Sequence, residues 1–335
     1  MEKNLTTGSV FKNVILFSLP YLLSYFLQTL YGMADLFIIG QYDGVASTTA
    51  VSVGSQIMHM ITVMIVGLAM GTTVSIAQAI GADNKKQASK AVGNTIVLFM
   101  GVAIVGMALL LMLVHPIVSV MSTPAEAVNG TVTYLTICFI GIPFITAYNI
   151  ISSIFRGMGD SKSPMEYLIT ASIINIILDL ILVGWLRFGV GAAAFATIAS
   201  QTVSAILAFA KLMRSQEEWA VRWREVRFDG PSLKAVIVQG LPSGVQNSVI
   251  SIANVIVQSN INSFGAQAMA GCGAYSKVEG FAFLPVTCFL MALATFVSQN
   301  VGAGQPDRVK KGMKFGSLCS VLMAEIVGLC IYFGS

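Results

Sequence analysis

Apolar residues along this chain occur in long runs, without the short alternating pattern of a soluble protein. A helix of about 20 residues, rising about 1.5 Å per residue, crosses the roughly 30 Å of hydrocarbon in a bilayer. Proline and glycine inside such runs do not exclude a helix, because neighbouring helices can satisfy the freed backbone groups. The pattern predicts an all-α, polytopic membrane protein. Nine spanning segments are expected, at 14–39, 51–77, 93–114, 131–155, 166–186, 191–213, 235–261, 275–299 and 315–335.

Composition supports the membrane assignment. The 335 residues are 56% hydrophobic and 10% charged, with a mean hydropathy of +0.80, whereas soluble domains carry about 25% charged residues. The five cysteines lie in apolar runs without CxxC or metal-ligand spacing, so we expect them to be packing residues and expect no metal centre beyond a Na⁺ site. The N-terminus is polar and lacks a cleavage site after it, so it is expected to be retained.

Lysine and arginine predict the orientation. All of the 19 basic residues except Arg187 and Lys277 fall at the N-terminus or in the loops after the second, fourth, sixth and eighth segments. These loops lie on one side of the membrane, and basic residues are enriched on the cytoplasmic side. The N-terminus is therefore predicted to be cytoplasmic in the cell membrane. The net charge of +4 follows from this topology and gives no reason to expect a nucleic-acid partner.

The chain contains an internal repeat. Leu19-Pro20 opens the first segment and Leu241-Pro242 opens the seventh, while MGTTVSIAQAIGA at 70–82 resembles MALATFVSQNVGA at 291–303. Six helices separate the copies, so both have the same orientation and form a parallel repeat. We expect an N-lobe of six helices over 1–215, a basic cytoplasmic loop over 216–234, and a partial C-lobe of three helices over 235–335. The second copy stops halfway, which predicts a chain truncated at its C-terminus.

Charged residues inside the predicted spans are the candidates for function, because each costs about 2.5–3.5 kcal/mol at the centre of a helix. Asp35 lies in the outer half of the first segment, and Asp179 lies just past the middle of the fifth. Asn175 is four residues before Asp179, on the same helix face. Two carboxylates and an amide at similar depth can bind a cation, or protons, since burial and mutual repulsion favour the neutral carboxyl. Alternatively, each acid only caps backbone or marks a helix end.

Three further charged residues in the predicted spans have less definite roles. Lys277 and Glu279 point to nearly opposite helix faces, and Lys277 can extend to the outer surface. Glu279 either lines a substrate cavity, where it would attract cations, or pairs with another polar helix. Glu325 is assigned no role. No enzyme is predicted: the stretch Arg156 to Asp160, RGMGD, lacks the lysine and strand context of a phosphate-binding loop.

Three motifs resemble the multidrug and toxic compound extrusion (MATE) family of transporters. They are QTLYGMADLFIIG at 28–40, NIILD at 175–179 followed by Gly184, and FRGMGDSKSP at 155–164. The resemblance covers essentially the whole chain. It implies two six-helix lobes around a central cleft and drug export driven by inward flow of Na⁺ or H⁺.

The resemblance also implies site residues. Asp35, Asn175 and Asp179 match the cation site of the family's N-lobe, and Pro20 matches the proline near which the first helix bends. More loosely, Tyr134, Asn149 and Thr197 match polar residues that line the same lobe. Members of the family have about twelve helices, so half of the second lobe is absent from this chain.

The sequence as a whole predicts a secondary antiporter that exports cationic amphiphilic drugs in exchange for H⁺ or Na⁺. We expect it to need no cofactor and to be monomeric when full length. The alternative within the related superfamily is a flippase of lipid-linked oligosaccharides, which would favour a strongly basic cavity. An alternative of another class is a membrane scaffold or sensor, which has no need for buried acids. The coupling ion and the range of substrates are not predicted.

Overall fold

The computed structural model describes residues 4–121, 123–214, 229–262 and 266–334, which are almost entirely helical and contain no strand. This confirms the predicted all-α membrane fold. The helices are α1 (Val10–Tyr42), α2 (Val45–Gly81), α3 (Lys85–Met112), α4 (Val114–Val120), α5 (Ala125–Ile140), α6 (Ile142–Gly157), α7 (Lys162–Asp179), η1 (Leu180–Trp185), α8 (Val190–Arg214), α9 (Gly230–Asn262), α10 (Ala266–Gly302) and α11 (Pro306–Gly334).

The predicted spans correspond to these helices with two differences. Among the described residues, seven helices are long and apolar enough to cross a membrane, and a bent pair, α5 with α6, adds an eighth. The 33-residue helix α9 is not among them, although a span was predicted at 235–261. Its interior carries Gln239, Gln246, Asn247 and Asn254, which lower its hydropathy, and it packs along α2. The contacts of α9 with α2 shield one side of α9 from lipid, which explains how a helix with these polar residues fits in the membrane.

The fourth predicted span, at 131–155, is broken. Helices α5 and α6 meet at an angle of 52° at Gly141. Pro143 follows in the first turn of α6, where a missing N–H costs nothing because the first helical N–H groups have no intrahelical acceptor. The side chain of Ile198 occupies the space where a Cβ at Gly141 would lie. Glycine therefore permits both the bend and the close approach of α8.

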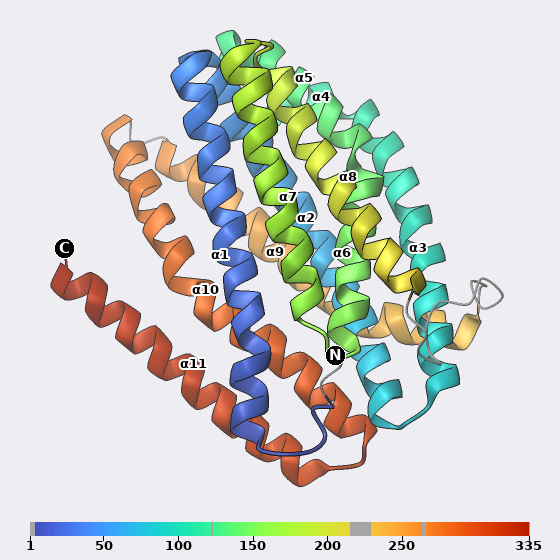
Figure 1. The fold of residues 1–335 in the computed structure, drawn as a ribbon. Helices are drawn as coiled ribbons and strands as arrows, with labels where there is room; N and C mark the ends of the chain where they lie inside the picture. Colours follow the sequence, from blue (N-terminus) through green and yellow to red (C-terminus); the bar gives the residue numbers. More distant parts are fainter. Residues whose placement is uncertain (1–3, 122, 215–228, 263–265, 335) are drawn as a thin grey trace.

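The two copies of the repeat pack against each other crosswise. Figure 1 shows α1 and α2 beside α10 and α9, and the closest helix pairs between the copies are α2 with α9, α2 with α10, and α1 with α10. Glycines make the approach of α2 and α9 possible: a Cβ at Gly71 would overlap the backbone of Val236 and Gly240, and one at Gly240 would overlap the carbonyl of Leu68. Small residues at helix crossings allow such backbone contact in membranes.

The repeated motif itself forms the crossing of α2 with α10. A Cβ at Gly81 would overlap the carbonyl of Gln299, and a Cβ at Gly302 would overlap the carbonyl of Gln78. The glycine of each copy thus lies against the backbone of the glutamine of the other copy. The two contacts lie at equivalent positions of the repeat. The sequence match at 70–82 and 291–303 therefore marks a contact between the copies.

The segment before α1 is fastened to the second copy by Arg308 of α11. Arg308 donates hydrogen bonds from Nε to Oδ1 of Asn300 (2.9 Å), from Nη1 to the carbonyl of Gly8 (2.7 Å), and from Nη2 to the carbonyls of Leu5 (3.1 Å) and Thr7 (3.3 Å). Asn300 also donates to the Leu5 carbonyl (3.3 Å). We call residues 4–9 with these partners the N-terminal clamp.

The clamp joins the two copies at one end of the bundle. The Leu5 amide donates to Oε1 of Gln299 (3.1 Å), and Nε2 of Gln299 donates to the carbonyl of Gly157 (3.2 Å). Leu5 is fully buried, and it belongs to an apolar cluster with Phe17 of α1 and Phe296 of α10. The start of α1 is therefore held by the second copy, and α1 packs along both α10 of the second copy and α7 of the first.

Replacement of Arg308 by alanine is expected to release the clamp. The guanidinium makes four hydrogen bonds, and their loss costs about 2 kcal/mol when partial exposure is considered, so amide exchange at Leu5 is expected to accelerate by about 30-fold. Hydrogen–deuterium exchange of residues 4–9 measures this. The matched control is Lys311→Ala, which removes the same charge from an exposed position three residues on. Equal exchange in both variants would mean that Arg308 does not hold the segment.

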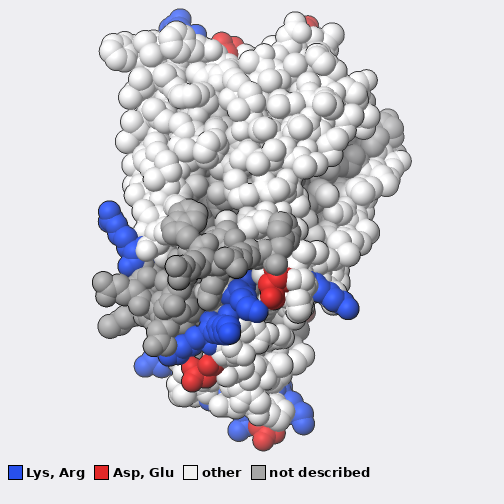
Figure 2. All heavy atoms as spheres, turned by 90° about the vertical axis from the view of Figure 1, so that its right-hand side faces the viewer, with Lys and Arg blue, Asp and Glu red and all other residues white. Residues whose placement is uncertain are grey.

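Charged side chains gather toward one end of the molecule. Figure 2 shows the lysines and arginines of the visible face mainly toward this end, with a broad band free of charge beyond them. We call this the basic end; it includes the N-terminal clamp and the turns between α2 and α3 and between α10 and α11. The uncharged band agrees with a surface in contact with lipid.

The predicted loop at 216–234 lies mostly outside the described residues, and α9 begins within it, at Gly230. Asp229 immediately before α9 accepts from the amide and hydroxyl of Ser232 and pairs with Lys90 of α3 at 3.0 Å. The hydroxyl bond and Lys90 lower the pKa of the Asp229 carboxyl. The basic loop thus ends in a helix cap anchored to the first copy.

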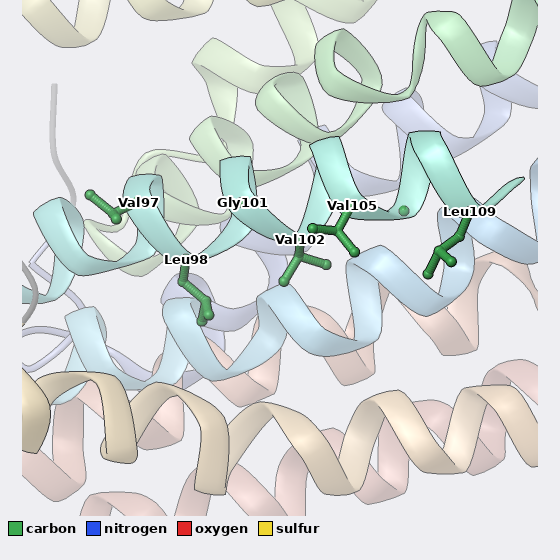
Figure 3. A pocket seen from close by; sticks show the side chains of 7 residues that line it. Val97, Leu98, Gly101, Val102, Val105 and Leu109 are labelled. Carbon is green, nitrogen blue, oxygen red and sulfur yellow. The ribbon is translucent and has the colours of Figure 1, made fainter. Parts of the chain in front are cut away.

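Two apolar surfaces face outward. A shallow groove along α3 is lined by Val97, Leu98, Gly101, Val102, Val105, Gly106 and Leu109, all from one helix (Figure 3). Helix α11 lies at the edge of the bundle against α10 and α1 (Figure 1). Its exposed side chains include Leu318, Leu322 and Ile326, with Glu325 among them. Residues of this kind on a spanning helix contact lipid or other helices.

Candidate functional site

Asp35 and Asp179 meet inside the first copy of the repeat. Asp35 lies on α1 and is 7% exposed, and Asp179 is the last residue of α7 and is 1% exposed. Their carboxyl groups lie within hydrogen-bonding range of each other. The two acids, 144 positions apart in the sequence, therefore lie together between packed helices.

Several polar atoms of this pair and of the neighbouring Asn175 have no partners. Oδ1 of Asp35, both carboxyl oxygens of Asp179, and both amide atoms of Asn175 are buried and accept or donate no hydrogen bond. Asn175 is 1% exposed and lies one helical turn before Asp179. Buried polar groups are nearly always paired in folded proteins, since leaving one unpaired costs about 1–3 kcal/mol. Five such atoms close together make this place a candidate for binding an ion or protons.

Local backbone structure places Asp179 at a change of helix type. Helix α7 ends at Asp179 and continues as the π-helical turn η1. π-Helical turns are rare and occur frequently at functional sites, because the wider turn shifts the register of the side chains. The turn continues to Trp185, after which Gly189 adopts a positive φ of 68° before α8 begins.

Two of the three more loosely assigned residues lie next to the acids. The hydroxyl of Thr197 on α8 is within hydrogen-bonding range of Asp35. Tyr134 on α5 is buried and lies close enough to Asp35 to interact electrostatically. Asn149 is partly buried on α6, and its amide donates to the carbonyl of Ile145 (2.8 Å) within its own helix. The structure does not bring Asn149 into contact with the acids.

Two further assigned residues are Pro20 and Glu279. Pro20 lies within α1, which continues through it as one helix and is not broken there. Glu279 falls within α10, but its side chain lies outside the described residues, so its place in a substrate cavity stays a prediction.

Three residues near the acids were not singled out from the sequence. Tyr31 lies close to Asp35 and within hydrogen-bonding range of Gln201 on α8, and Cys138 lies beside Tyr134. Each is four positions from a predicted residue on the same helix: 31 and 35, 134 and 138, 197 and 201. Side chains four apart share a helix face. That spacing is a signal in the sequence that would have identified them.

This arrangement is chemically suited to holding positive charge. Two carboxylates at hydrogen-bonding range repel each other, so the pair is stabilised by a shared proton or by a bound cation. Carboxylate and amide oxygens are the ligands of hard cations, and Asn175 supplies a neutral oxygen beside the acids. Thr197 adds a hydroxyl next to Asp35. In the described residues, no cluster of three His, Cys, Asp or Glu side chains that could hold a metal ion is present.

Comparison with known proteins identifies the family. The MatE family model matches residues 20–181 and 242–335. The chain belongs to the MatE family. The two matched segments begin at Pro20 and Pro242, which are the prolines that open the two copies of the repeat. Both matched segments therefore begin where the sequence analysis places the start of a copy.

Relatives of this MatE protein are named as drug-resistance proteins. It is 30% identical over 331 residues to the probable multidrug resistance protein NorM of Thermotoga maritima. The alignment covers 96% of this chain and 70% of that protein. It is 30% identical over 310 residues to the probable multidrug resistance protein YpnP of Bacillus subtilis, covering 91% and 68%. A crystal structure of MATE in the straight conformation matches with a TM-score of 0.89 at 24% identity, covering 98% of this chain and 74% of that one.

Proposed function

We propose that this MatE-family protein is a secondary antiporter that exports cationic amphiphilic drugs in exchange for inward-moving H⁺ or Na⁺. The observation that carries the proposal is the pair Asp35 and Asp179, buried together with unpaired oxygen atoms. The names of the relatives, multidrug resistance and multidrug export proteins, support drugs as the substrate class.

The proposed mechanism is alternating access between two lobes in the cell membrane. The basic end faces the cytoplasm, in accord with the enrichment of lysine and arginine there. Binding of the coupling ion at Asp35 and Asp179 favours one orientation of the lobes, and its release favours the other, because a ligand shifts a two-state equilibrium only through its different affinity for the states. The drug crosses in the opposite direction.

The experiment that tests this function uses the purified protein in proteoliposomes. Uptake of a fluorescent cationic dye is measured under an imposed pH gradient and, separately, under an imposed Na⁺ gradient of the same size. We expect dye to accumulate against its own gradient under at least one of the two. Dye movement that only follows its own gradient, with neither ion having an effect, contradicts the antiport proposal.

Asn175 offers a way to distinguish the two coupling ions. Asn175→Leu keeps the side-chain volume and removes the amide oxygen. If Na⁺ is the coupling ion, loss of this ligand is expected to raise the Na⁺ concentration for half-maximal exchange by about tenfold, in line with about 1.4 kcal/mol. If H⁺ is the coupling ion, exchange changes less than threefold. The matched control is Asn149→Leu. Asn149 belongs to the same lobe and makes no contact with the acids, so this variant is expected to change neither the Na⁺ concentration for half-maximal exchange nor the exchange rate.

A further inference from the structure

Arg156 lies between the two copies of the repeat, near the basic end. The sequence places it in a loop, whereas the structure places it in the last turn of α6. Its guanidinium carbon lies 5.0 Å from the ring centroid of Tyr21 on α1 and its side chain is within hydrogen-bonding range of Tyr25. Cys288 of α10 lies close enough to Arg156 to interact with it electrostatically. The charge is thus held where the first copy contacts the second.

The tyrosines that surround Arg156 belong to the same contact. The Tyr25 hydroxyl donates to the sulfur of Met291 on α10 at 3.1 Å. Tyr21 is 3% exposed and packs in the apolar cluster of α1 with α10. These contacts form an aromatic layer between the lobes. The crossing of α2 with α10 and the N-terminal clamp join the lobes at the same end.

No described carboxylate neutralises Arg156. The nearest acid in the sequence, Asp160, is engaged elsewhere: its Oδ1 accepts from the amides of Lys162 and Ser163 (both 3.0 Å), and its Oδ2 lies 3.8 Å from Nζ of Lys211. Stacking on an aromatic ring attracts a guanidinium but leaves its full positive charge in place. Arg156 is partly buried, and an uncompensated charge is costly to hold among packed helices, so a functional role would explain its presence.

We infer that Arg156 is a charge barrier in this contact between the lobes, and that it prevents cations from passing between them while the basic end is closed. The inference rests on the proposed antiport function, since an exchanger that leaked its coupling ion would dissipate the gradient that drives it. Packed apolar side chains exclude a hydrated drug, but small cations and protons can follow water that enters transiently. A fixed positive charge in a pore excludes such ions electrostatically.

The test measures the leak of cations through the protein in the absence of drug. Proteoliposomes with wild type, Arg156→Gln or Arg156→Lys receive an inside-negative potential from a K⁺ gradient and valinomycin, and entry of H⁺ and of Na⁺ is followed with internal indicator dyes. A unit charge acting over about 10 Å at an effective dielectric constant of about 20 slows a cation about tenfold or more. We therefore expect Arg156→Gln to raise cation entry by about tenfold, and Arg156→Lys to stay within about twofold of wild type.

The matched control is Lys314→Gln, which removes a charge from an exposed position at the same end and is expected to leave the leak unchanged. Wild-type leak in a folded Arg156→Gln protein, checked by its thermal unfolding, overturns the inference. If Arg156→Gln does not fold, Tyr21→Leu decides: removing the ring that holds the guanidinium is expected to raise the leak, and an unchanged leak overturns the inference. Failure of the antiport proposal is a separate result, the absence of ion-driven dye exchange by the wild type.

Discussion

Replacement of both Asp35 and Asp179 by asparagine is expected to abolish ion-driven dye exchange, with a fall of at least about 100-fold. Asparagine keeps the size of each side chain and removes the charge that holds the coupling ion. Each charge-assisted contact is worth about 1.5–3 kcal/mol, and two are lost. The measurement is dye exchange in proteoliposomes under the gradient that drives the wild type. Exchange at the wild-type rate would rule out the proposed coupling mechanism.

The single variants Asp35→Asn and Asp179→Asn are expected to lose nearly as much activity as the double variant. The two carboxyls share one ion or proton, so removing either destroys the site, and the effects of residues in one unit are not additive. The control is Asp43→Asn, an exposed aspartate just beyond the end of α1, which is expected to stay within about twofold of wild type. Strictly additive single effects would show that the two acids act independently.

The double substitution Gly81→Ala with Gly302→Ala is expected to open the basic end. At both positions the added methyl group meets a backbone carbonyl of the opposite copy, which cannot rotate away as a side chain can. Overpacking of this kind costs about 1–3 kcal/mol per site, so the closed arrangement is expected to lose at least about 30-fold in population. Distances between spin labels at Lys86→Cys and Lys310→Cys, which are exposed positions in the α2–α3 and α10–α11 regions, measure the opening.

Gly101→Ala on α3 is the control for this prediction. It has nothing within 4 Å of the added Cβ, and alanine is favoured over glycine within a helix by up to about 1 kcal/mol. We therefore expect no change in the label distances and equal or higher thermal stability. Unchanged distances in the Gly81 and Gly302 variant would contradict the role of these glycines in holding the basic end closed.

The membrane fold was determined by the sequence, since apolar runs of spanning length admit few alternatives in a bilayer. Exceptions arose where tertiary contacts outweighed the local pattern. The run at 131–155 bends by 52° at Gly141, because the side chain of Ile198 approaches that position from another helix. Helix α9 carries more polar residues than a lipid-exposed helix usually does, and its contacts with α2 and α3 cover part of it.

The candidate site was only partly determined by the sequence. Asn175 and Asp179 are one turn apart, so helical geometry alone places them on one face. Their meeting with Asp35 required α1 and α7 to pack side by side, which no local pattern specifies. The similar depth of the two acids in the predicted spans raised that expectation and resemblance to the MATE family reinforced it. The resemblance also supplied Asn149, whose amide bonds within its own helix.

The sequence by itself determined that this protein lies in a membrane and which end is basic, and it predicted a duplicated design and the burial of Asp35 and Asp179. These properties depend on hydropathy, charge and repetition, all of which are local or additive along the chain. Only the tertiary structure decided that the repeated motifs touch each other at Gly81 and Gly302, and that Arg156 leaves its predicted loop to stack on Tyr21. These facts depend on how distant helices cross, and crossing is set by the packing of the whole bundle.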